Sequence, residues 1–68
     1  METDELAIHD MRRLVVYWYH KGWSDADYGA EFAPPDNAFL RASYARGNVD
    51  WIAGTFTDEI DLLNEVLE

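Results

Sequence analysis

The sequence predicts an all-α fold of three to four short helices around an aromatic core. Apolar residues recur at intervals of three and four over most of the chain, which places them on one side of a helix. Capping residues followed by acids stand at several points, as at helix starts. Three Trp, four Tyr and three Phe supply side chains that each bury about 150–250 Å². We therefore expect one domain over residues 1–68, with the tryptophans in its core.

The first expected helix covers residues 4–21. Thr3 can cap its first amides, and the two acids that follow suit the positive end of the helix dipole. Gly22 is expected to end the helix in the left-handed conformation. The core face of the helix would comprise Ile8, Met11, Val15, Trp18 and Tyr19.

The second expected helix is short and covers residues 25–32. Ser24 would be its N-cap, and acids again stand in the first turn. Pro34 and Pro35 would end it, because a proline pushes the residue before it out of helical geometry.

The rest of the chain predicts two further helices. The third covers residues 37–46 or continues to residue 53, with Asp36 or Asn37 as its cap. Its apolar residues are Phe39, Leu40, Ala42 and Tyr44. The last helix covers residues 58–67 and follows a threonine cap. Its apolar side would comprise Ile60, Leu62, Leu63, Val66 and Leu67.

Two stretches of the sequence follow the same pattern. YHKGWSDADYG (19–29) and YARGNVDWIAG (44–54) both read Tyr, any residue, a basic residue, Gly, two residues, Asp, three residues and Gly. We interpret this as the same local helix-stop and helix-start signal used twice, in which the first Gly ends one helix and Ser24 or Asn48 caps the next. One alternative is a true duplication. Another is two longer helices in which the glycines allow close helix–helix approach, at a cost of about 1 kcal/mol for each mid-helix glycine.

Acidic charge is the strongest single feature of the composition. Fourteen Asp and Glu residues against five Lys and Arg give a formal net charge of −9 at pH 7, and no basic residue follows Arg46. Such a field repels phosphate backbones and attracts basic surfaces. The sequence thus predicts a protein partner with a basic surface and no direct contact with nucleic acid; the alternative is that acidity only keeps the chain soluble. The predicted contact residues of the last helix are Asp58, Asp61, Glu65 and Glu68.

A second predicted contact surface lies on the first helix. Val16 and Tyr17 fall on its polar face, opposite Val15 and Trp18. An apolar pair on a polar face indicates a contact with another chain or with the last helix. In the first case the protein would be a homodimer that pairs through this helix.

The sequence shows no catalytic, cofactor-binding or metal-ligating set. It contains no cysteine, which fits a reducing cytoplasm. His9 and His20 stand eleven residues apart, about 16 Å along a helix, and cannot share a metal ion. DADYGAEFAPPD has aspartates at the spacing of a calcium loop but lacks its central Gly and final Glu. The longest strongly apolar run, LVVYWY, is far shorter than the roughly 20 residues of a membrane span. We therefore predict a cytoplasmic, non-enzymatic protein without a cofactor.

The segment GWSDADYGAEFAPPDNAFLRAS resembles the core of helix-turn-helix proteins, in which a short helix meets a turn and then a second helix. The resemblance implies a helix-turn-helix-like centre for the fold. It makes Tyr28, Gly29 and Phe32 the characteristic positions of the first helix, and Phe39 and Ala42 inward positions of the second. As an alternative function it implies a dimeric transcription regulator. The residues that could then face DNA are Asn37, Arg41, Ser43 and Arg46.

The order of KGWSDADYG, APPD and RGNVDWIAG is similar to that in ribosome modulation factor and related small proteins. In them a Gly-rich helical segment, a Pro-containing loop and a second Gly-containing segment follow one another. This resemblance implies contact with ribosomal RNA, for which a basic surface is expected.

We therefore predict first an accessory or inhibitory protein, of the kind that small phage and mobile-element genes encode, that binds a basic surface of its target. A ribosome-modulation-factor-like function is the further alternative.

Overall fold

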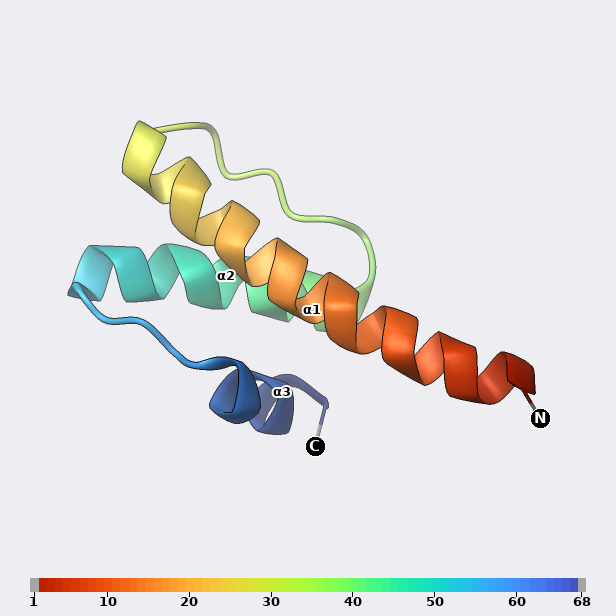
Figure 1. The fold of residues 1–68 in the computed structure, drawn as a ribbon. Coiled ribbons are helices and arrows are strands. Elements are labelled where there is room, and N and C mark those ends of the chain that lie inside the picture. Colours follow the sequence, from red (N-terminus) through yellow and green to blue (C-terminus); the bar gives the residue numbers. More distant parts are fainter. Residues whose placement is uncertain (1, 68) are drawn as a thin grey trace.

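The computed structural model describes residues 2–67, with side chains over residues 10–67. The described residues form three α-helices joined by two irregular connections, and they contain no strand (Figure 1). The helices are α1 (Glu2–Tyr28), α2 (Ala38–Ala53) and α3 (Glu59–Leu67). The prediction of an all-α fold is confirmed.

α1 is one continuous helix where the sequence predicts two. It passes through Gly22 and Ser24, which were expected to end one helix and begin the next. Gly22 lies against the backbone of Tyr44, so packing on α2 offsets the cost of about 1 kcal/mol of a mid-helix glycine. An ion pair between Lys21 and Asp25, at 3.3 Å, also spans the expected break.

The short helix expected over residues 25–32 is not a separate element. Its first four residues are the end of α1, and the others belong to the turn and the connection that lead to α2. Gly29 ends α1 with a φ of 73°. Phe39 and Ala42, which the helix-turn-helix resemblance places inward, are both exposed. The fold therefore buries a different side of α2.

α2 has the longer of its two predicted extents. Asn37 is its N-cap, and the side-chain Oδ1 accepts hydrogen bonds from the backbone N–H groups of Phe39 (2.9 Å) and Leu40 (3.1 Å). The helix continues through Gly47 and ends at Gly54, which has a φ of 75°. Each of the two long helices thus passes through the first glycine of its repeat and ends at the second.

α3 begins at Glu59, and its N-cap is Asp58 instead of the expected Thr57. The Asp58 carboxylate accepts a hydrogen bond of 2.9 Å from the backbone N–H of Asp61. The Thr57 hydroxyl faces the other way and donates to the Asp50 carboxylate at 2.6 Å. Thr57 therefore anchors the connection to α2, and the residue after it caps the helix.

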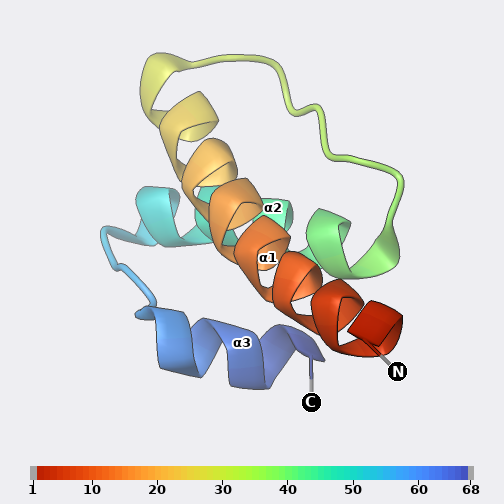
Figure 2. The same ribbon diagram turned by 45° about the vertical axis from the view of Figure 1, so that its right-hand side comes forward.

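The core lies where the three helices meet. Its buried hydrophobic members are Val15, Tyr19, Leu40, Tyr44 and Leu62. Partly buried side chains pack around them: Met11, Val16, Trp18, Trp23, Leu63, Val66 and Leu67. Figure 2 shows α3 below the crossing of α1 and α2. Ile60, expected on the apolar side of the last helix, is 72% exposed, because it stands two residues before the buried Leu62 and so faces nearly the opposite side of α3.

Candidate functional site

α1 and α2 cross in close contact at one glycine from each helix. A Cβ on Gly22 would overlap the carbonyl group of Tyr44, and a Cβ on Gly47 would overlap the carbonyl oxygen of Tyr19. Neither glycine has a positive φ, so close approach of the two backbones is what requires glycine at these positions. The interpretation of both glycines as helix stops is wrong. The alternative, two longer helices in close contact, is correct for Gly22 and Gly47.

The two copies of the repeated pattern make reciprocal hydrogen bonds across this crossing. The Tyr19 hydroxyl donates to the Asp50 carboxylate at 2.6 Å, and the Tyr44 hydroxyl donates to the Asp25 carboxylate at 2.5 Å. Each tyrosine of one copy therefore binds the aspartate of the other. Reciprocal contacts of this kind are those of a two-fold arrangement. The aspartates, expected to be first-turn acids, lie instead in the last turn of their helices.

The other members of the pattern are equivalent as well. Each aspartate pairs with the basic residue four positions earlier, Lys21 with Asp25 at 3.3 Å and Arg46 with Asp50 at 3.0 Å. At both helix ends the backbone N–H groups of the glycine and of the next residue donate to carbonyls of the last turn. This is the Schellman arrangement, which satisfies carbonyl groups that the helix leaves unpaired.

Both connections contact the crossing through its tyrosine hydroxyls. The backbone N–H of Ala33 donates to the Tyr44 hydroxyl at 3.2 Å, and that of Thr57 donates to the Tyr19 hydroxyl at 2.8 Å. A phenylalanine precedes each of these amides and packs edge-on against the same tyrosine ring, with centroids 5.2 and 5.3 Å apart. The two phenylalanines are Phe32 and Phe56.

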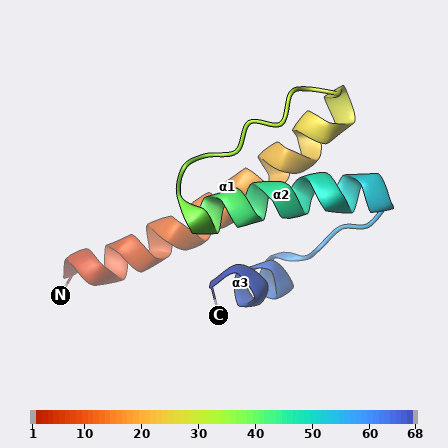
Figure 3. The same ribbon diagram turned by 180° about the vertical axis from the view of Figure 1, so that it is seen from behind.

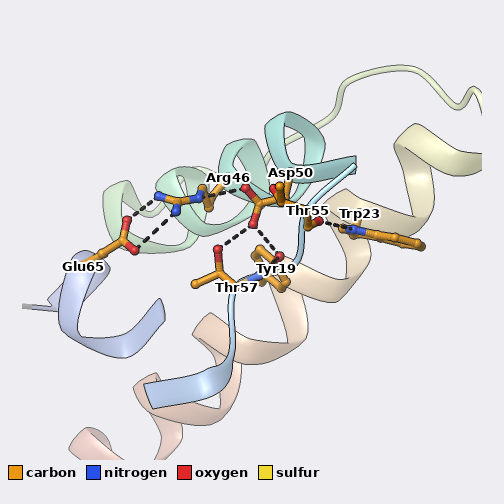
Figure 4. Close-up of polar contacts among 7 residues, drawn as sticks. All are labelled: Tyr19, Trp23, Arg46, Asp50, Thr55, Thr57 and Glu65. Atoms are coloured by element: carbon orange, nitrogen blue, oxygen red, sulfur yellow. Dashed lines mark hydrogen bonds and ion pairs between the residues drawn. The ribbon is translucent and has the colours of Figure 1, made fainter. Parts of the chain in front are cut away.

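Asp50 is the centre of a polar network that joins all three helices (Figure 4). Its side chain is 6% exposed and accepts hydrogen bonds from Tyr19, from Thr57 and from the Nε of Arg46. The guanidinium of Arg46 also binds both carboxylate oxygens of Glu65 on α3. In the described part of the chain no buried side-chain nitrogen or oxygen lacks a hydrogen-bond partner. The network is therefore complete within the chain and has a structural role.

These contacts change the pKa of the groups that they join. Burial alone would raise the pKa of Asp50, but the hydrogen bonds from its three donors outweigh burial and lower that pKa below its usual value. The hydrogen bond from Tyr44 lowers the pKa of Asp25. Burial, reinforced by the hydrogen bond to a carboxylate, raises the pKa of both Tyr19 and Tyr44. At neutral pH the aspartates are charged acceptors and the tyrosines are neutral donors.

The acids predicted to form a contact strip on the last helix have different roles. Asp58 is the N-cap of α3, and Asp61 is exposed. Glu65 is exposed, as expected, and its carboxylate also binds the guanidinium of Arg46. Glu68 lies outside the described residues. Of this set, Asp61 is the acid best placed to meet a partner.

The apolar pair predicted on the first helix is also divided. Val16 is partly buried, packs against the core and lines a hollow between α1 and α3 together with Leu63. It therefore makes the contact with the last helix that was one of its two expected roles. Tyr17 is 55% exposed and lies edge-on to Trp18, with ring centroids 5.3 Å apart.

The residues that the helix-turn-helix resemblance would direct at DNA are mostly used by the fold. Asn37 caps α2, and the buried Ser43 hydroxyl donates to the carbonyl oxygen of Val15. Arg46 belongs to the Asp50 network. Arg41 is exposed, and its Nε donates to the carbonyl oxygen of Pro35 at 3.3 Å.

The surface is strongly acidic because fourteen acids stand against five bases, and most of these bases are also paired within the chain. Lys21, Arg41 and Arg46 all form ion pairs. Arg12 and Arg13 form no ion pair with another described residue, and they line the hollow between α1 and α3. The exposed acids among the described side chains are Asp10, Asp27, Glu31, Asp36, Asp58, Glu59, Asp61 and Glu65.

The aspartates with calcium-loop spacing lie in separate contacts. Asp25 accepts from Tyr44, and Asp27 accepts a hydrogen bond of 3.0 Å from the indole Nε1 of Trp51. Over the described side chains, no group of three His, Asp or Glu residues is placed to hold a metal ion. Within residues 2–67, no helix has both the length and the apolar character to cross a membrane.

Comparisons with known proteins found no relative. A scan against protein-family models, a search of curated proteins and a search of solved structures each gave no match. The functional proposal below therefore rests on the geometry and the charge of this chain.

Proposed function

We propose that the chain is a non-enzymatic protein-binding module, an accessory or inhibitory protein whose acidic surface occupies a basic surface of a target. The distribution of charge supports this most directly. Three of the five bases are paired inside the chain, whereas the exposed acids lie on α1, on α3 and on both connections. A surface of this kind attracts a basic partner and speeds its encounter with the protein.

Glu59 and Asp61, in the first turn of α3, are the acids that we assign to the contact. Both are exposed, and neither forms an ion pair with another described residue. The buried Leu62 anchors α3 in the core, and the ion pair of Glu65 with Arg46 holds α3 against α2. Charges on a fixed support lose little freedom when they bind, which favours a specific contact.

The experiment begins with capture of partners from an extract of the native host at about 0.15 M salt, where the Debye length is about 8 Å. Association rates with the purified partner are then measured for three chains. They are the wild type, the double variant Glu59→Lys/Asp61→Lys and the control Glu31→Lys/Asp36→Lys. The control changes the net charge equally, but on the connection between α1 and α2.

We expect the α3 variant to associate at least several-fold more slowly than the wild type and the control to change less, because local charge steers the encounter. Equal slowing in both variants would contradict the assignment to α3. A flat salt dependence with unchanged rates would mean that the acidity serves solubility alone. Micromolar, sequence-specific binding to duplex DNA would support the transcription regulator instead, since ordinary non-specific binding at this salt is weaker.

A further inference from the structure

The outer side of α2 is apolar although it faces solvent. The residues opposite its buried side are Ala38, Ala42, Ala45, Val49 and Ile52. Their spacing of four, three, four and three aligns them along one side of the helix. We call these five residues the α2 outer face. The two larger side chains are 58% and 75% exposed. Figure 3 shows α2 on the near side of the molecule, with no element in front of it.

The reciprocal crossing supplies an internal control for this face. Positions 25 residues earlier occupy the equivalent places on α1, as Tyr19 does for Tyr44 and Gly22 for Gly47. The five equivalents of the α2 outer face are Arg13, Tyr17, His20, Ser24 and Asp27, all exposed. The same crossing therefore forms with polar side chains at these places. The packing of the two helices within one chain therefore does not require apolar residues on the α2 outer face, and a contact with another molecule would explain them.

Charge indicates which occupant suits the α2 outer face. The only acid in α2 is Asp50, which is buried and paired. Arg41 and Arg46 flank the face on its two sides. A basic target gains nothing from such a surface. Two copies of a chain with a net charge of −9 repel each other least when they meet at a face without acids.

The α2 outer face is also complementary to itself. Its first three residues are alanines, and its last two are Val49 and Ile52. In an antiparallel pair of α2 helices, the alanine half of each helix lies against the Val–Ile half of the other. Small side chains opposite large ones fill such an interface without voids or overlap. A two-fold pair also presents the same patch on both subunits.

We propose that two copies of this chain associate through their α2 outer faces, with the two α2 helices antiparallel. This dimer contact differs from the predicted one, which used the first helix. It leaves the acids of α3 outside the pairing face and is independent of the proposed target. α1 of each copy then lies on the far side of α2, where its polar outer side meets solvent.

Matched substitutions in the two helices test the proposal. Ala42→Glu places a charge in the α2 outer face, and Tyr17→Glu places the same charge at the equivalent position of α1. Sedimentation equilibrium over a concentration series gives the mass of each chain, and circular dichroism reports its helix content. We expect the wild type and Tyr17→Glu to have twice the mass of one chain, and Ala42→Glu to have the mass of one chain at equal helix content.

Two results would overturn the proposal. The first is a wild type that stays monomeric at every concentration, which would leave the face to a different kind of partner. The second is a dimer that dissociates with Tyr17→Glu and persists with Ala42→Glu, which would place the interface on α1.

Single cysteines provide a measurement that does not depend on weakening the fold, because the natural chain has no cysteine. A disulfide requires Cα atoms within about 7 Å of each other. An oxidised mixture of Ala42→Cys and Val49→Cys chains, whose positions face each other in the antiparallel pair, should therefore give mainly the mixed disulfide between copies. If disulfides between two Ala42→Cys chains or two Val49→Cys chains predominate, the helices are parallel and the antiparallel arrangement is wrong. If no disulfide forms between copies at either position, the α2 helices do not meet.

Discussion

α1 and α2 use the same residues toward each other and different residues toward solvent. On the inside, the Tyr–Gly–Asp positions of one copy of the repeat contact those of the other reciprocally. On the outside, equivalent positions are polar in α1 and apolar in α2. The comparison separates two kinds of information in one short pattern. The shared residues specify the helix crossing, and the residues between them are free to specify a partner.

The two aspartates show a second difference between the copies. Asp50 is buried, has three side-chain donors and is connected through Arg46 to α3. The Asp25 side chain is 15% exposed and has two side-chain donors, Tyr44 and Lys21. The difference arises because α3 and its connection cover the side of the crossing on which Asp50 lies. Of the two reciprocal tyrosine–aspartate pairs, the pair that contains Asp50 therefore also binds α3 and its connection.

The largest expected effect is on the free energy of unfolding, and it differs between the two glycines of the second repeat. Gly47→Ala should cost about 3 kcal/mol, because its Cβ meets backbone atoms of α1 that cannot move aside. This is much of the roughly 3–10 kcal/mol expected for a domain of this length. Gly54→Ala should cost only about 1 kcal/mol, because it strains a left-handed φ but meets no atom. Urea unfolding followed by circular dichroism measures both.

The sign of the Gly47→Ala effect is diagnostic. Helix propensity alone predicts that replacing a mid-helix glycine by alanine stabilises the protein by about 1 kcal/mol. A stabilised Gly47→Ala variant would show that the helices are not in backbone contact at this position. Gly22→Ala should behave like Gly47→Ala, since its Cβ would meet the backbone of Tyr44.

The next expected effect distinguishes the two aspartates. Asp50→Asn keeps the size of the side chain but removes the charge that three donors share, and it should cost about 2–3 kcal/mol. Asp25→Asn should cost clearly less, because this side chain is closer to solvent and has fewer donors. The same urea experiment measures both. Equal losses would mean that the extra contacts of Asp50 add nothing to stability.

The smallest expected effect is a pH dependence centred on Asp50. Its pKa is lower in the folded than in the unfolded state, so its charge stabilises the fold above the unfolded pKa of about 4. That contribution is lost as the pH falls through the folded pKa. The stability difference between the wild type and Asp50→Asn should therefore be largest at neutral pH and should shrink below about pH 4. A difference that stays constant down to strongly acidic pH would assign the effect to packing.

Helix ends with local chemical signals could be predicted from the sequence. Asn37 caps α2 and the proline-containing segment separates the two long helices, as expected. Gly22 and Ser24 show the same local signals but lie inside α1. Their conformation depends on contact with Tyr44, which is 22 residues away from Gly22 in sequence, and no local pattern reports such a contact. Tertiary packing here overrides propensity.

The candidate site was only partly predictable for a related reason. The repeat is visible in the sequence, but a repeat alone does not show that its tyrosine and aspartate bind each other. Their constant separation of six residues in both copies is the available signal, because reciprocal pairing requires it. The core was expected to hold the tryptophans. Tyrosine takes the central places instead, since its hydroxyl reaches an aspartate across the crossing, and Trp51 lies nearer the surface.

The tyrosine hydroxyls have a consequence for the order in which the protein opens. Each is held between a carboxylate and one backbone amide, Ala33 in the first connection and Thr57 in the second. Neither connection can leave the helices without giving up a hydrogen bond at the crossing. Irregular segments usually exchange their amide hydrogens through small local openings. At these two amides, exchange instead requires the loss of a hydrogen bond to a tyrosine of the crossing, so each connection is held to the helix pair by a polar contact that its neighbouring amides lack.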